Sequence, residues 1–419
     1  MKILQINKFY HLRGGAERYM LTLSHLLEEH GHTVIPFAMQ HPNNLPSPYQ
    51  EYFVSPVDTH ASPWSAAGIA AAARVLWSRE AERKIEALIQ KTKPDLAHLH
   101  LIYHHLSPSI LPVLVRHHIP IVMTLSDYKL ICPNYKLYTQ GSPCERCRGG
   151  KYYEATVHKC LRDSVAASAL GSVEMYFHKM LKVYERSVDL FIAPSHFVRD
   201  EFVKFGQDGL KIRVLPYFLP TIPPPEKHGT REPLILYVGR LSKEKGVDKF
   251  LEMVHALPSP WRIAIIGTGP EEAPLQERFG KRSGVVFVGH VEGDALAAWY
   301  QRASIAVVPS QFFEPFGIVV IEALSYGVPV VASNRGALPE IIDHEKTGLI
   351  VPADDGDAWR SAIARLIQDE RLRQSMGKNG RKVAAILYAR EMHYTKLIEW
   401  YEELVQKKIS NSQLPISNK

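Results

Sequence analysis

The sequence predicts an α/β protein of two doubly wound domains, each with a parallel sheet covered by helices. Three observations support this. The chain has 419 residues, more than one hydrophobic core usually holds. Strand-like and helix-like segments alternate along it, which favours parallel sheets with right-handed crossovers. A proline-rich stretch without periodicity, LPYFLPTIPPPEKHGTREP, separates two such series.

The first series begins with the strand-like segment KILQIN and a Gly-rich turn. The segment AERYMLTLSHLLEEHGH has apolar residues at helical spacing and ends near Gly31, which is typical of a helix. TVIPFAM, DLAHLH, PIVMTLS and LFIAPS predict further strands. We expect an N-terminal domain over residues 1–218 and a linker over 219–233.

The second series repeats the alternation. LILYVGR, WRIAIIG, VVFVGH, IAVVPS, PVVAS and TGLIV predict strands, and helices are expected after most of them. These segments predict a C-terminal domain over residues 234–388. A last helical pattern, expected over 389–410, could pack on either domain.

The composition and the net charge restrict the classes of molecule that the protein could bind. The net charge of +7 and the pI near 9.0 favour an anionic partner, either nucleic acid, an acidic membrane surface or a phosphorylated small molecule. No run of Lys and Arg with interleaved aromatic residues predicts a nucleic-acid groove, so we expect no nucleic acid. The N-terminus turns polar after six residues, so it predicts a strand and neither a signal peptide nor a membrane span.

The Ala-rich stretch SPWSAAGIAAAARVLW is the most apolar long segment. It is shorter than the roughly 20 residues that cross a bilayer, so it predicts a packed helix. An interfacial helix is the alternative, because the basic residues Arg74, Arg79, Arg83 and Lys84 accompany it. We expect a cytoplasmic protein, with attachment to the inner face of the membrane left open.

The four cysteines fall within one segment, at about residues 130–162, and include the pair CERC. A CxxC with two further cysteines at moderate distance is typical of structural zinc. The ligands of that zinc would be Cys132, Cys144, Cys147 and Cys160. Reduced cysteines without a metal are the alternative. A catalytic metal is not expected there, because four thiolates would close the coordination shell.

Two turns offer anion sites. Gly14 and Gly15 lie between the first strand and the first helix, where backbone N–H groups and the helix dipole favour a phosphate. Arg240 and Lys245 follow another strand, before a helix that Gly246 helps to begin. A guanidinium fork and an ammonium group at this position suit a diphosphate.

Two carboxylates surround the segment PFG. Glu314 and Glu322 are too far apart on a helix to work as an acid and base pair, since eight residues span about 12 Å. We expect a helix to begin at residues 315–317, with N–H groups that bind oxygen atoms of the ligand. These N–H groups belong to Phe316, Gly317, Ile318 and Val319. Glu314 would then hold a sugar and Glu322 a ribose on either side of a diphosphate, which describes a nucleotide sugar.

These motifs resemble the retaining glycosyltransferases of the GT-B fold, family 4 type, which include bacterial polysaccharide and lipopolysaccharide enzymes. The segment EPFGIVVIEALSYGVPVVASNRGALPEII with TGLIVP matches the family's E-x7-E region. VGRLSKEKG matches its diphosphate-binding Arg and Lys, and RGGAE its N-terminal glycine loop. The resemblance covers essentially the whole chain. It implies two Rossmann-like domains facing across a cleft, with the final helix crossing back to the first domain.

The resemblance also implies a mechanism. A sugar would pass from a nucleotide-diphosphate sugar to a glycan or a polyprenyl-diphosphate-linked acceptor with retention and without a catalytic cofactor. Arg240 and Lys245 would stabilise the leaving diphosphate. Many relatives have His-Asp where this chain has Ser126 and Asp127. Asp127 is retained as a catalytic candidate, and Ser126 implies weakened or altered specificity.

Two other kinds of function remain open. One is a nucleotide-sugar binder without catalysis, which the Ser126 departure permits. The other is a phosphorylase or epimerase on the same scaffold, although the sequence offers no lysine that we can assign to pyridoxal phosphate. The fold alone does not separate these activities.

Overall fold

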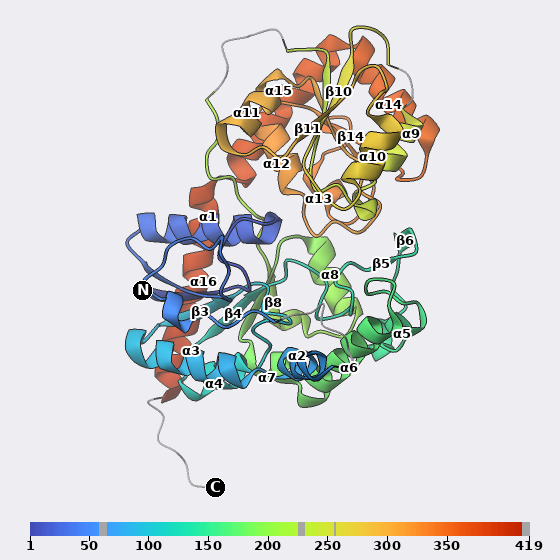
Figure 1. Cartoon of the computed structure of the whole chain (residues 1–419). Coiled ribbons are helices and arrows are strands. Elements are labelled where there is room, and N and C mark those ends of the chain that lie inside the picture. Colours follow the sequence, from blue (N-terminus) through green and yellow to red (C-terminus); the bar gives the residue numbers. More distant parts are fainter. Residues whose placement is uncertain (58–64, 225–230, 255–256, 413–419) are drawn as a thin grey trace. The chain divides into compact units, whose positions relative to one another are not determined.

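The computed structural model describes residues 1–57, 65–224, 231–254 and 257–412, and these residues form two compact units (Figure 1). Unit 1 comprises residues 1–136, 145–215 and those from His393 onward, and unit 2 comprises 137–144 and 216–392. Each unit contains one six-stranded sheet, and every strand pair in it is parallel. The predicted α/β class with two doubly wound sheets is therefore confirmed.

The division between the units lies after Leu215, close to the boundary predicted at residue 218. Residues 225–230 of the predicted linker lie outside the described residues. Residues 137–144, part of the Cys-containing segment, form the hairpin of β5 (Tyr138–Thr139) and β6 (Ser142–Pro143) and belong to unit 2.

The sheet of unit 1 has the strand order β2-β1-β3-β4-β7-β8. Its strands are β1 (Lys2–Ile6), β2 (Thr33–Phe37), β3 (Leu96–Leu99), β4 (Ile121–Thr124), β7 (Leu190–Ala193) and β8 (Ile212–Val214). Its helices are α1 (Gly15–Glu29), α2 (Ala66–Leu76), α3 (Arg79–Thr92), α4 (Ile110–Arg116), α5 (Glu154–Val157), α6 (Val165–Leu181), α7 (Val183–Ser187), α8 (His196–Lys204) and most of α16 (Arg390–Ser412).

The sheet of unit 2 has the order β11-β10-β9-β12-β13-β14. Its strands are β9 (Leu234–Val238), β10 (Arg262–Ile266), β11 (Val285–Gly289), β12 (Ile305–Val308), β13 (Val330–Ser333) and β14 (Gly348–Val351). Its helices are η4 (Lys243–Lys245), α9 (Val247–Met253), α10 (Glu272–Phe279), α11 (Gly293–Arg302), α12 (Ile318–Ser325), α13 (Leu338–Ile341), α14 (Gly356–Gln368) and α15 (Glu370–Leu387). In Figure 1, α9, α10 and α14 cover one face of this sheet and α11, α12 and α15 the other.

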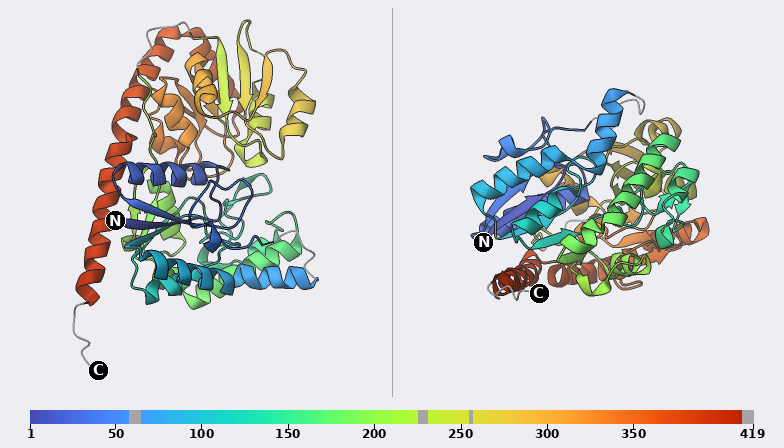
Figure 2. Two further views of the ribbon diagram at one scale, coloured as in Figure 1. Left: turned by 60° about the vertical axis from the view of Figure 1, so that its left-hand side comes forward. Right: turned by 90° about the horizontal axis from the view of Figure 1, so that it is seen from below.

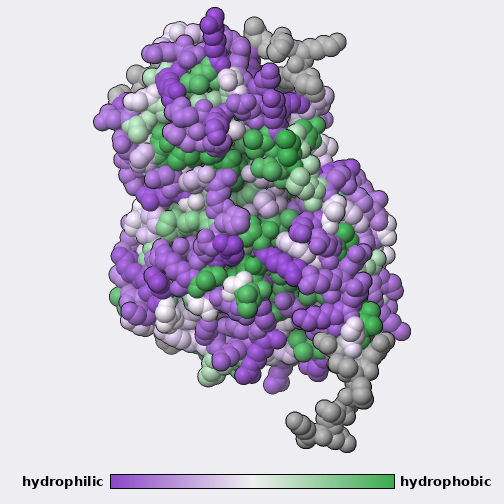
Figure 3. Space-filling view, turned by 180° about the vertical axis from the view of Figure 1, so that it is seen from behind, coloured by the Kyte–Doolittle hydropathy of each residue, from purple (hydrophilic) through white to green (hydrophobic). Residues whose placement is uncertain are grey.

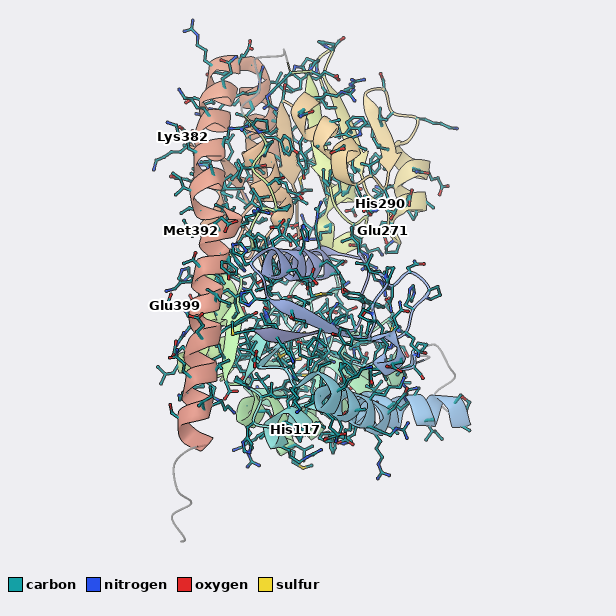
Figure 4. The ribbon with its side chains drawn as sticks, turned by 90° about the vertical axis from the view of Figure 1, so that its left-hand side faces the viewer. His117, Glu271, His290, Lys382, Met392 and Glu399 are labelled. Carbon is teal, nitrogen blue, oxygen red and sulfur yellow. The ribbon has the colours of Figure 1, made fainter. Side chains whose placement is uncertain are left out.

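Helix α16 matches the predicted 389–410 closely and passes from unit 2 to unit 1. Figure 4 labels Met392, the last residue of unit 2, and Glu399 of unit 1 on this helix. Within unit 1 the helix is held by buried polar contacts. Tyr19 of α1 bonds His393 at 3.0 Å, and His98 of β3 bonds Tyr401 at 2.5 Å.

The surface mixes hydrophilic residues with apolar patches, as the view in Figure 3 shows. Within the described residues, no helix is both long and apolar enough to span a bilayer.

Candidate active site

The candidate site of unit 2 lies where the strand order of its sheet reverses, between β9 and β12. The two strands are neighbours, and the chain continues outward from them in opposite directions. In sheets of this kind, ligands bind beyond the carboxyl ends of the strands at such a point. The loop after β9 carries Arg240 and Lys245, and the loop after β12 carries Glu314. The topology therefore brings these three predicted residues to one edge of one sheet.

The loops after β9 and β12 can approach each other closely because residue 246 is a glycine. Gly246 has φ +70° and follows η4, and a Cβ at this position would lie 2.2 Å from the carbonyl oxygen of Pro309. Only glycine fits such a left-handed position with so close a neighbour. The backbone N–H of Gln311 also donates to the carbonyl of Glu244 at 2.8 Å.

Glu314 is a buried carboxylate, 5% exposed, held by two donors. Lys245 Nζ donates to Oε1 at 2.7 Å, and Ser310 Oγ donates to the same oxygen at 2.5 Å. Among the described residues, Oε2 accepts no hydrogen bond from a side chain or backbone group. The carboxylate is thus fixed through one oxygen, while the other is available to a ligand hydroxyl.

The helix after Glu314 begins later than predicted. Helix α12 starts at Ile318, and Gly317, its N-cap residue, has φ +124° and ψ +63°. This conformation is outside the helical region, so residues 315–317 cannot form the first turn. Phe316 is therefore not at the helix end. Its buried ring packs against Tyr217 and Tyr388 instead, with centroids 5.2 and 5.9 Å away. Ile318 and Val319 keep the N-terminal position that was predicted for them.

Glu322 lies one turn into α12 and is half-buried. The hydroxyl of Tyr300 in α11 donates to its Oε2 at 3.0 Å. Tyr300 is itself buried, and its ring stacks on Tyr326 with centroids 5.4 Å apart. A neighbouring helix therefore orients this carboxylate.

Arg240 differs from Lys245 in having an exposed side chain, for which no hydrogen-bond or ion-pair partner exists among the described residues. Lys245 forms an ion pair with Glu314, and its Nζ also lies over the ring of Phe312, 4.9 Å from the ring centroid. The structure thus brings Lys245 and Glu314 into direct contact and leaves the Arg240 guanidinium able to reach a ligand.

The predicted residues of unit 1 lie near the corresponding reversal point of the first sheet, between β1 and β3. Gly14 is the N-cap residue of α1 and Gly15 its first residue. Both are exposed, but the buried carboxylate of Glu17 is close, because a Cβ on Gly14 would lie 3.5 Å from its Oε2. A negative charge there would repel a phosphate, so the phosphate role of this turn stays a prediction.

Asp127 is half-buried and accepts a hydrogen bond from the backbone N–H of Lys129 at 2.9 Å. Burial raises the pKa of its carboxyl to about 6, although this hydrogen bond and the Lys8 and Lys129 ammonium groups act in the opposite direction. A carboxyl that titrates near neutral pH can exchange a proton, which keeps Asp127 a candidate.

Comparison with known proteins identifies the family. The family model of glycosyl transferases group 1 matches residues 220–383, and that of glycosyltransferase family 4 matches residues 13–129. Sucrose-phosphate synthase from Thermosynechococcus elongatus has a similar fold, with a TM-score of 0.69, 21% identity, and a match over 97% of this chain and 100% of that chain. The chain belongs to the GT-B glycosyltransferases of the family 4 type.

Two further proteins are similar to this chain, one in fold and one in sequence. HepE of Anabaena in complex with UDP-glucose has a TM-score of 0.65 and 17% identity over 96% of this chain and 100% of that chain. The lipopolysaccharide core biosynthesis mannosyltransferase LpsB of Rhizobium meliloti is 34% identical over 181 residues, which are 40% of this chain and 51% of LpsB. This chain spans about half the length, or less, of the first curated relatives it matches.

The predicted structural zinc gains no support from this GT-B structure. In the parts of the chain that the structure describes, no group of three or more His, Cys, Asp or Glu side chains is placed to hold a metal ion. Cys144 belongs to unit 2 and the other three cysteines to unit 1. Cys147 lies in a small apolar cluster with Tyr152, and Cys160 packs against it. The zinc on Cys132, Cys144, Cys147 and Cys160 stays a prediction.

Sequence reasoning missed three residues of the unit 2 site, namely Ser310, Tyr300 and Gly336. Gly336 has φ +63°, and a Cβ there would lie 2.3 Å from the backbone N and O of Glu314. The loop after β13 can therefore pack against Glu314 only with glycine at this position. The sequence did carry a signal for Ser310, since it ends the segment IAVVPS four residues before Glu314. The sequence carried no signal for Tyr300, because its hydrogen bond to Glu322 joins two different helices and follows no local pattern.

Proposed function

We propose that this GT-B protein is a retaining glycosyltransferase that moves a sugar from a nucleotide-diphosphate sugar to a glycan or lipid-linked acceptor. The observation that carries the proposal is the Glu314 carboxylate at the reversal point of the second sheet. Lys245 and Ser310 hold its Oε1, so Oε2 can accept a hydrogen bond from a sugar hydroxyl. Such a carboxylate would fix the orientation of the donor sugar.

The proposed donor has its diphosphate beside Arg240, Lys245 and the N-terminus of α12. Two cations and the positive end of a helix favour the charge of a diphosphate. Glu322, oriented by Tyr300, would accept hydrogen bonds from the ribose. The complex of HepE with UDP-glucose is a precedent on this fold and supports a nucleotide-sugar donor.

In the proposed reaction, the bond between the anomeric carbon and the diphosphate oxygen breaks as the acceptor oxygen bonds to that carbon. The acceptor hydroxyl's proton passes to the leaving diphosphate. Arg240 and Lys245 stabilise the developing negative charge, so we propose that the reaction needs no metal. The protein then contributes mainly positioning and charge stabilisation.

The choice of acceptor rests on one of the curated relatives. LpsB acts, by its name, in lipopolysaccharide core biosynthesis, which favours a role in cell-surface polysaccharide synthesis. We propose that the protein works in the cytoplasm and reaches a polyprenyl-diphosphate-linked acceptor at the inner face of the membrane.

Thermal shift and calorimetry with UDP-, GDP- and ADP-linked sugars test the proposal. We expect sugars linked to one of these nucleotides to stabilise the wild-type protein. They should bind at least tenfold more weakly to the Glu322→Ala variant, because the hydrogen bond from the ribose hydroxyl to the Glu322 carboxylate is lost. The exposed Glu277 of α10 supplies a matched control, Glu277→Ala, which should bind like wild type. Slow donor hydrolysis without acceptor distinguishes a transferase from a binder. The proposal fails if no nucleotide sugar binds.

A further inference from the structure

Helices α2, α5 and α6 of unit 1 pack together on one side of that unit (Figures 1 and 2). His178 of α6 bonds the carbonyl of Leu76 at the end of α2 at 2.9 Å. Ser172 of α6 bonds Thr156 of α5 at 2.9 Å. These hydrogen bonds join one side of α6 to α2 and α5, so the opposite side of α6 faces away from both helices.

The outward side of α6 is apolar. Val165, Val173, Tyr176 and Met180 are all exposed, Met180 by 73%. Their spacing of three, four or eight residues places them on one stripe of the helix. A globular helix normally presents polar residues on its solvent side, so this stripe is unusual.

Helix α2, which packs against α6, is also apolar on its exposed side. Its exposed residues are Ala66, Ala67, Ile69, Ala70 and Ala73, with Ile69 exposed by 62%. Helix α5 and its start add Tyr153 and Val157. We call these residues of α2, α5 and α6 the α2–α6 face. Including Leu181, this region holds eight of the nineteen large hydrophobic residues that are exposed in the described chain.

The exposed charges of the segment that contains α5 and α6 are strongly asymmetric. Between residues 145 and 186, only Asp163 is an exposed acid. The exposed basic residues of the same segment are Arg146, Arg148, Lys151, Lys159, Arg162, Lys179, Lys182 and Arg186. An anionic surface complements this arrangement, because it attracts basic side chains within about a Debye length.

We propose that the α2–α6 face docks on an anionic lipid bilayer, with Ile69, Val173 and Met180 entering the headgroup region. Apolar side chains surrounded by Lys and Arg are the composition of interfacial helices. A second copy of the chain fits less well, since two copies would bring eight exposed basic residues together on each side. The proposal rests on the proposed function only in the choice of a membrane that carries the acceptor.

Vesicle flotation tests the docking. The full chain is mixed with vesicles of phosphatidylcholine, or of phosphatidylcholine with about one third phosphatidylglycerol. We expect it to float with the anionic vesicles only, and to lose most of that binding in about 0.5 M salt, where charges are screened. The variant Val173→Asp/Met180→Asp should bind at least about tenfold more weakly, because its apolar stripe is interrupted. Leu210→Asp is the matched control, since Leu210 is 95% exposed in unit 1 outside the face, and should float like wild type.

Charge is tested separately with Arg148→Glu/Lys151→Glu, compared with Lys382→Glu in α15 of unit 2. Weaker binding of the first variant alone supports the proposal. Equal binding by wild type and Val173→Asp/Met180→Asp would overturn it. A wild-type dimer in solution that becomes monomeric in this variant, without any vesicle binding, would make the face a self-association surface and also overturn it. Nucleotide-sugar binding, which these variants should keep, reports on the proposed function independently.

Discussion

Lys245 and Glu314 form an ion pair in unit 2, with Nζ 2.7 Å from Oε1, across 69 residues of sequence. The side chain of Glu314 is 7% exposed and that of Lys245 is 29% exposed. Removing one partner of a mostly buried pair leaves the other charge unpaired. Lys245 would therefore act twice, as a support for Glu314 and as a cation for the donor diphosphate.

Replacing Lys245 by Ala should lower kcat by about 10²–10³-fold, as expected when one preorganised charge donor is lost. The measurement is sugar transfer, or donor hydrolysis when no acceptor is known. Lys243→Ala is the control, because Lys243 lies in the same short helix η4 but is exposed. An equal loss in both variants would show that the loop responds to any loss of positive charge, and would refute a specific role for Lys245.

Ser310→Ala tests orientation of Glu314 without changing charge. Ser310 Oγ donates to Glu314 Oε1 at 2.5 Å, and its own carbonyl accepts a bond from Ser333 Oγ at 2.7 Å. Loss of one hydrogen bond to a charged group should lower kcat about tenfold, while the donor Kd changes by less than about twofold. Calorimetry and turnover measured together separate the two effects. A weaker Kd with unchanged kcat would instead place Ser310 in donor binding.

Tyr300→Phe tests the support of Glu322. The substitution keeps the buried ring and removes only the hydroxyl that donates to Glu322 at 3.0 Å. We expect the donor Kd to rise about five- to tenfold, since bonds to charged groups contribute more than neutral ones. Tyr388→Phe, another buried tyrosine of unit 2, is the control and should bind the donor normally. Unchanged affinity in Tyr300→Phe would argue against a ribose contact at Glu322.

The sequence predicted the parts of this molecule that local patterns encode. Alternating strands and helices specified two parallel sheets, and the loops after β9 and β12 carried Arg240, Lys245 and Glu314 to one sheet edge. The helix start was misplaced because Pro315 is a good first helical residue, whereas the φ of +124° at Gly317 depends on tertiary packing.

Long-range polar contacts were not predictable in this way. Tyr300 and Glu322 lie on different helices, and His98 meets Tyr401 across 303 residues of sequence. A lone buried histidine in a strand has no signature of its own, so its partner becomes visible only once α16 is placed on unit 1. The steric need for glycine at Gly336 likewise depends on its approach to Glu314.

Gly336→Ala should be strongly destabilising and should also impair activity. The substitution places a Cβ 2.3 Å from the backbone of Glu314 at a φ of +63°, so the loop must move. A left-handed alanine alone costs about 1–2 kcal/mol, and the clash adds to this. Gly31→Ala is a control for the backbone conformation alone, because Gly31 has φ +78° but a Cβ added there would have no neighbouring atom within 4 Å. Thermal unfolding of both variants checks the prediction, which fails if they are destabilised equally.

Asp127→Asn should stabilise unit 1 at high pH. The folded pKa of Asp127, about 6, exceeds its ordinary 3.8, so the folded state prefers the protonated carboxyl and stability is lost as the pH rises through 6. Asn mimics the protonated form. We expect the variant to gain about 3 kcal/mol at pH 8 and about half of that at pH 5, where part of the folded-state preference for the protonated carboxyl is still expressed. Urea unfolding at both pH values measures this difference, and a gain that is the same at pH 5 and pH 8 would contradict it.

Acidification should weaken the attachment of α16 to the sheet of unit 1. His98 and His100 are fully buried, with ring centroids 4.4 Å apart, and His98 bonds both Tyr401 and Thr124. Burial lowers the pKa of both rings, that of His100 to about 3, so the folded state keeps them neutral. Stability is therefore lost as the pH falls below the ordinary histidine value of 6.5, when the unfolded chain binds protons that the folded chain does not.

Between pH 7.5 and 5.5 the two histidines together should cost unit 1 about 2–3 kcal/mol, partly offset by Asp127, whose folded form gains a proton in the same range. Hydrogen exchange of peptides from β3 and α16, corrected for intrinsic rates, measures this change. In a His100→Gln variant, which retains a polar group facing Gln5, the loss over the same interval should shrink by about 1.4 kcal/mol. An unchanged pH dependence in that variant would show that His100 does not contribute, because a purely structural effect shifts stability equally at both pH values.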